Sequence, residues 1–146
     1  MKSFQFRLER VLSWRGTQLS VEEAKVEQLA GGLRTTDHAM ACVVEGRAAA
    51  QASVERAATV SGADLRVLEA SRLWAVREEK RLAARKVTLK LAIETQNRRV
   101  AEARLGVKLV ERLKERKYDV WKADASRESD ELAAESAIAQ WRRLNH

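Results

Sequence analysis

A seven-residue repeat of apolar side chains is the feature of this sequence that most constrains its fold. In the first of two long stretches, positions spaced alternately by three and four residues are mostly apolar: Leu8, Leu12, Arg15, Leu19, Glu22, Val26, Leu29, Leu33, Thr36, Met40, Val43, Arg47, Ala50, Val54 and Ala57. This average spacing of about 3.5 residues is typical of a helix in a left-handed coiled coil. We therefore expect a long helix over about residues 3–60.

The second stretch carries the same repeat. Its positions are Leu65, Leu68, Arg72, Ala75, Glu79, Leu82, Lys86, Leu89, Ile93, Gln96, Val100, Ala103, Val107 and Val110. We call the two sets the seam positions. They predict a second, longer helix over about residues 62–143 that can pair with the first along a narrow apolar seam. Beyond Val110 the register is expected to drift, and residues 126–131 are expected to fray because they are polar.

The residues that could interrupt these helices are few. The chain has 146 residues, no proline and six glycines. Proline is the strongest helix breaker, so its absence permits very long helices. The pair Gly31 and Gly32 is expected to bend or soften the first helix rather than end it. The alternative is a turn there, which would make three helices.

One segment, Thr59–Asp64, has the features of a turn between the helices. Gly62 is a permissive turn residue, and Ser61 followed three positions later by Asp64 resembles a capping box. A connection this short forces the second helix to run back along the first. The sequence thus predicts an all-α fold, an antiparallel coiled-coil hairpin with its turn near residues 60–64, as a single domain over residues 1–146.

The net charge of +7 is unevenly distributed. Residues 77–117 alone hold 14 basic and 6 acidic side chains. Such a basic stripe can attract nucleic acid, acidic membranes or an acidic protein partner. It can equally be a solvated helix face whose charges pair along the helix.

The sequence contains no pattern typical of catalysis or of cofactor binding. It has no nucleotide-binding loop and no nucleophile paired with a base. His38 and Cys42 are one helical turn apart, but two ligands are too few for a structural zinc site. A two-helix rod offers no pocket that excludes water, so we expect a non-enzymatic protein without metal or cofactor.

The sequence also bears on the compartment. Cys42 is the single cysteine, which rules out an internal disulfide bond and favours a reducing compartment. The first residues lack the apolar run of a secretory signal, and no apolar stretch is long enough to span a membrane. The sequence thus favours a soluble protein.

The chain opens with Phe4, Phe6, Leu8, Val11, Leu12 and Arg15, followed by Glu22 and Glu23 and a long heptad helix. This pattern resembles the FliJ family, the small coiled-coil component of the flagellar type III export apparatus. Chain length, lack of proline, basic charge and the short turn near residue 62 also agree. The resemblance is specific over about the first fifteen residues and is architectural over the rest.

The resemblance implies a non-enzymatic central stalk or adaptor. Its paired terminal helices would enter the pore of a hexameric export ATPase and promote ring assembly and ATP turnover. It would also contact the cytoplasmic domain of the export gate and export chaperones, and lie in the cytoplasm at the inner membrane through these partners, without binding nucleic acid. The expected ring-binding residues are Phe4, Phe6, Arg7, Leu8, Val11, Leu12 and Arg15.

The gate-binding surface has no motif of its own. Our prediction for it is a mid-rod to turn-end region that includes Met40, Arg47, Arg72, Trp74 and Arg77. Trp74 lies off the seam, since Arg72 and Ala75 take the seam positions, and it is therefore expected to face outward.

Three other functions fit the sequence. The first is the equivalent stalk of a virulence type III secretion system, which shares the architecture. The second is a basic coiled coil that binds nucleic acid or anionic membrane through residues 77–117. The third is a structural spacer that oligomerises through its seam.

Overall fold

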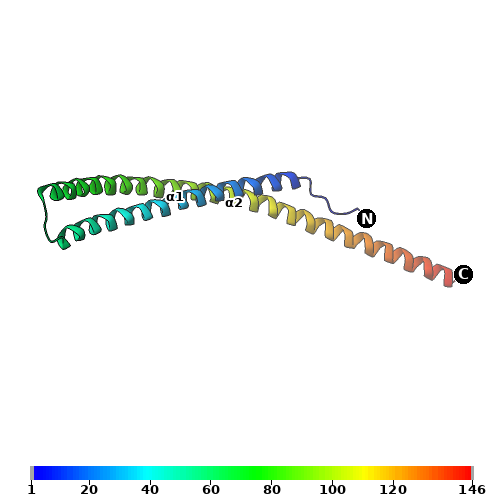
Figure 1. The fold of residues 1–146 in the computed structure, drawn as a ribbon. Coiled ribbons are helices and arrows are strands. Elements are labelled where there is room, and N and C mark those ends of the chain that lie inside the picture. Colours follow the sequence, from blue (N-terminus) through cyan, green and yellow to red (C-terminus); the bar gives the residue numbers. More distant parts are fainter. Residues whose placement is uncertain (1, 146) are drawn as a thin grey trace. The chain divides into compact units, whose positions relative to one another are not determined.

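The computed structural model describes residues 2–145 and consists of two long helices (Figure 1). Helix α1 spans Glu9–Arg56 and helix α2 spans Gly62–Leu144. They form a helical hairpin, which confirms the predicted fold class. The end residues of the expected domain, Met1 and His146, lie outside the described part. The chain divides into two compact units: the residues up to Ser20 with those from Glu102 onward, which we call unit 1, and Val21–Ala101, which we call unit 2.

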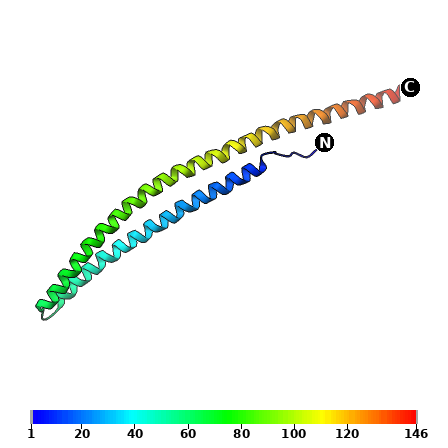
Figure 2. The ribbon, with the colours of Figure 1, turned by 90° about the horizontal axis from the view of Figure 1, so that it is seen from above.

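In unit 2 the two helices run side by side in opposite directions (Figures 1 and 2). Three contacts between them show this direction, because the residue number on α2 rises as that on α1 falls. They are the ion pairs Arg47–Glu79 at 3.6 Å and Asp37–Lys86 at 2.7 Å, and the hydrogen bonds between Glu22 and Gln96. The shared period of the two stretches lets the helices pair, and the short connection makes the pairing antiparallel.

The buried residues of both helices are all seam positions. The other seam positions on the helices are half-buried, except for Arg15, Arg47, Leu65 and Arg72, which are exposed. Leu8 and Ala57, which precede and follow α1, are also exposed. In unit 2, the core is a cluster of Val43, Ala75 and Leu82, against which Ala39 and Met40 pack. The heptad positions predicted from the sequence are thus the positions at which the two helices pack against each other.

Within unit 1 the two segments also run antiparallel, and polar and aromatic residues link them. Contacts join Arg15 to Gly106, Glu9 to Lys114, and the backbone of Lys2 to Trp121. The seam spacing continues after Val110 through Lys114, Lys117 and Trp121, of which Lys114 and Trp121 are half-buried and Lys117 is exposed. The predicted loss of register after Val110 was therefore wrong as far as Trp121. A lysine occupies the next seam position, and an ion pair rather than an apolar contact holds it there.

The turn between the helices is built by the predicted capping box. The Ser61 N–H donates to Oδ2 of Asp64 at 3.0 Å, and the Asp64 N–H donates to Oγ of Ser61 at 3.1 Å. These hydrogen bonds satisfy amides that the first helical turn leaves without partners. The Ser61 amide, followed by the Ser61 hydroxyl, lowers the pKa of the Asp64 carboxyl because both favour its charged form. α1 ends at Arg56, four residues earlier than predicted, since residues 57–61 form the connection.

The glycine pair does not interrupt α1, so the alternative of three helices was wrong. Neither glycine has a positive φ angle. The hydroxyls of Thr35 and Thr36 donate to the carbonyls of Gly31 and Gly32 at 3.0 and 2.9 Å. Gly32 faces the seam, where a Cβ would lie 3.7 Å from Leu89. The polar residues 126–131 likewise do not interrupt α2, which corrects the expected fraying.

Candidate partner-binding surface in unit 1

The amino-terminal segment, residues 2–8, does not belong to α1. The first helix was predicted from residue 3, but it begins at Glu9. Before it, Phe4 and Phe6 are half-buried while Ser3, Gln5 and Arg7 are exposed. This alternation has the period of two of an extended chain. Burial of the two phenylalanines on one side is the physical reason that the helix starts late.

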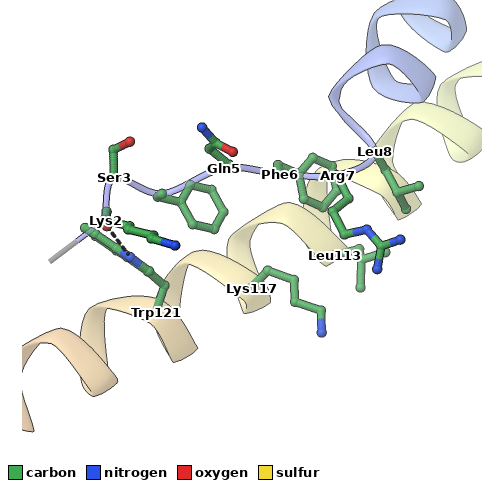
Figure 3. A pocket seen from close by; sticks show the side chains of 10 residues that line it. Lys2, Ser3, Gln5, Phe6, Arg7, Leu8, Leu113, Lys117 and Trp121 are labelled. Atoms are coloured by element: carbon green, nitrogen blue, oxygen red, sulfur yellow. Dashed lines mark hydrogen bonds between the residues drawn. The ribbon is translucent and has the colours of Figure 1, made fainter.

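The aromatic rings of the segment and of α2 form a cluster. The Phe4 ring meets the Tyr118 ring edge-on, with centroids 5.3 Å apart, and lies 5.9 Å from the Trp121 ring. Tyr118 and Trp121 stack at 5.6 Å. The indole N–H of Trp121 donates to the backbone carbonyl of Lys2 at 3.2 Å (Figure 3). Aromatic pairs at these distances are favourable, so the cluster attaches the segment to α2.

Between the segment and α2 lies an apolar hollow with cationic residues around it. Its volume is about 690 Å³. Phe6, Leu8 and Leu113 contribute apolar surface, and Lys2, Arg7 and Lys117 contribute ammonium and guanidinium groups (Figure 3). The other lining residues are Ser3, Phe4, Gln5 and Trp121. A surface with these two properties suits a protein partner that presents apolar and acidic side chains.

One ion pair and one packing contact link α1 to α2 within unit 1. Lys114 Nζ lies 2.8 Å from a Glu9 carboxylate oxygen. The guanidinium of Arg15 lies over Gly106, where an added Cβ would come within 2.7 Å of Nη1. The absence of a side chain at Gly106 gives space for a charged residue at a seam position. Sequence reasoning identified Arg15 as a weak point of the seam but could not identify the glycine opposite it.

The structure brings together part of the predicted ring-binding set. Phe4, Phe6, Arg7 and Leu8 line one hollow. The remaining three lie further along α1: Leu12 is half-buried in the seam, whereas Val11 and Arg15 are exposed. Sequence reasoning missed Tyr118 and Lys117 as neighbours of this set. Their positions follow only once the antiparallel register is known.

The predicted gate-binding residues all lie in unit 2, in different environments. Met40 packs against the apolar cluster. Arg47 pairs with Glu79 across the seam, and Arg72 pairs with Glu69 on its own helix at 2.8 Å. Trp74 is 58% exposed, as its off-seam position predicted, and Arg77 is exposed. Of these five residues, Trp74 and Arg77 are the two for which the described part of the chain shows neither packing in the apolar cluster nor an ion pair.

The described residues were also compared with the requirements of a metal site and of a membrane-spanning helix. Among residues 2–145, no three histidine, cysteine or acidic side chains lie close enough to share a metal ion. His38 Nε2 and Cys42 Sγ are 3.6 Å apart on the surface of α1. No helix in this part of the chain is long and apolar enough to cross a membrane.

Neither protein-family models, nor curated proteins, nor solved structures gave a match to the chain.

Proposed function

We propose that this protein is a non-enzymatic stalk and adaptor of a flagellar type III protein export apparatus, and that unit 1 enters the pore of the hexameric export ATPase. The proposal rests on the FliJ-like residues Phe4, Phe6 and Leu8. One observation carries it furthest: these three residues line a single hollow together with α2. A motif that only stabilised the hairpin would not need an open, cationic surface beside it.

The hairpin suits this role physically. A pair of long helices without internal chemistry can occupy a ring asymmetrically and bias its subunits unequally. The cations around the hollow, Lys2, Arg7 and Lys117, would complement an acidic lumen, and such contacts weaken with salt. Unit 2 would then contact the cytoplasmic domain of the export gate through a surface that includes Trp74 and Arg77. A virulence secretion stalk would use the same architecture.

Charge pairing counts against the nucleic-acid or membrane alternative. Within residues 77–117, Arg81 pairs with Glu78 and Arg98 with Glu94, and Lys86 pairs with Asp37 of α1. Neutralised cations contribute little to the field that binds phosphates. The basic stripe predicted from the sequence is therefore partly a set of ordinary helix ion pairs.

The test is ATP turnover and ring assembly of the cognate export ATPase with and without the protein. Wild-type protein should raise both. The triple variant Phe4→Ala, Phe6→Ala, Leu8→Ala should lose most of the effect. The matched control, Val60→Ala with Val67→Ala, removes exposed apolar side chains from unit 2. This control should raise ATP turnover and ring assembly as the wild type does. A protein that leaves both quantities unchanged, or a triple variant that is fully active, would contradict the proposal.

A further inference from the structure

The outer surface of α2 in unit 1 carries a second apolar row. Leu105 and Leu109 are 58% and 59% exposed, although the seam side of the same stretch is half-buried. Arg112 and Arg116 follow them and are also exposed. The spacing of four, three and four residues puts all four side chains on one face of the helix. We call these four residues the outer row.

The two arginines of the outer row have no described ion-pair partner. Within residues 2–145, no carboxylate pairs with Arg112 or Arg116, whereas Lys114 between them pairs with Glu9 across the seam. Exposed leucines cost free energy in water, and unpaired arginines are ready to bind carboxylates. The outer row thus has an apolar half and a cationic half.

The chain contains a close copy of this pattern that lacks the cationic half. Val87 and Leu91, eighteen residues before Leu105 and Leu109, are 59% and 61% exposed and have the same spacing. At the two following positions stand Glu94 and Arg98, which pair with each other at 3.1 Å. The copy has an equivalent apolar pair but no unpaired charge, which makes it an internal control.

We propose that the outer row is a docking site for an amphipathic helix of a protein partner, with leucine-like side chains against Leu105 and Leu109 and carboxylates against Arg112 and Arg116. Charge complementarity selects this occupant. The partner helix would lie along the side of α2 that α1 does not cover, as a third helix beside the hairpin. This inference goes beyond the proposed function and does not depend on it.

Two other occupants fit the outer row less well. In a membrane, Arg112 and Arg116 would lie in line with the leucines, in the middle of the face that must enter the lipid, and two leucines bury little apolar area. In a second copy of this chain aligned in parallel, arginine would face arginine, which is repulsive. An antiparallel copy would place arginine against leucine and leave both arginines unpaired.

The test measures binding of the full chain to a labelled alanine-based helical peptide of about 18 residues. The peptide carries two leucines and two glutamates with the spacing of the outer row. Wild-type protein should bind it, with an affinity that falls as salt rises. Leu105→Ser with Leu109→Ser should weaken binding by at least about tenfold, and so should Arg112→Glu with Arg116→Glu. Both variants should keep their helical circular dichroism, since the replaced side chains are exposed.

Two controls make the result specific. A peptide with lysines in place of the glutamates should bind the Arg112→Glu, Arg116→Glu variant and not the wild type. Val87→Ser with Leu91→Ser should bind the original peptide as wild type does. Absence of wild-type binding, an equal loss in the Val87/Leu91 variant, or association with phosphatidylserine vesicles that the Leu105/Leu109 variant abolishes would each overturn the proposal.

Discussion

Gln96 of α2 donates hydrogen bonds to Glu22 of α1, to its backbone carbonyl at 3.1 Å and to its carboxylate. Both residues occupy seam positions, and Gln96 is buried. A polar layer of this kind in an apolar seam fixes the register of the helices, because a shifted pairing would leave the amide without partners.

Replacing Gln96 by alanine should therefore destabilise unit 2. The variant loses the hydrogen bonds and leaves a small void, which should lower the free energy of unfolding by about 1–2 kcal/mol. Chemical denaturation followed by circular dichroism measures this change. Gln51→Ala is the control, since Gln51 is exposed and its hydrogen bond among the described residues is to Glu55 on its own helix. Equal effects of the two substitutions would show that the layer does not stabilise the seam.

The same layer predicts a pH dependence. The hydrogen bond from Gln96, followed by that from Lys25, lowers the pKa of the Glu22 carboxyl below its ordinary value of 4.5. The charged carboxylate is thus favoured in the folded state, so its stabilisation is complete above that value and is lost as pH falls through the lower folded-state pKa. Melting temperatures of wild type and Gln96→Ala should converge as the solution is acidified through this range. A constant gap between them would contradict the linkage.

The capping box at the turn gives a third prediction. Asp64→Ala removes the carboxylate that accepts from the Ser61 amide, and it should cost about 0.5–2 kcal/mol of folding free energy. Thermal unfolding measures this cost. The control is Ser126→Ala, an exposed position within α2. A melting temperature for Asp64→Ala equal to that of the control would show that the turn does not depend on the box.

The glycines of the helices differ in a testable way. At Gly16 an added Cβ would have nothing within 4 Å, whereas at Gly106 it would meet the Arg15 guanidinium at 2.7 Å. Gly16→Ala should stabilise the protein by roughly 0.5–1 kcal/mol through helix propensity alone. Gly106→Ala should stabilise the protein less than Gly16→Ala does, because the Arg15 side chain must move to make room for the added methyl group. Equal gains in thermal stability would mean that Arg15 does not pack on Gly106.

How far the sequence predicts this structure depends on whether a feature is periodic. The repeat located the seam from Leu12 to Val110, and Ser61 with Asp64 located the turn. The late start of α1 was missed, although Phe4 and Phe6 alternate with polar residues, since a period of two over five residues is short beside a long heptad pattern. Contacts such as Arg15 on Gly106 depend on the register between distant segments, which one sequence does not specify.

In the proposed function, residues 2–8 rather than the turn meet the export ATPase. Photo-crosslinking tests it most directly, with benzoylphenylalanine at Gln5, an exposed position in the hollow, and separately at Val67, an exposed position near the turn. We predict that the probe at Gln5 crosslinks to the ATPase in its hexameric form and that the probe at Val67 does not. Crosslinks from Val67 alone, or from neither position, would contradict the claim.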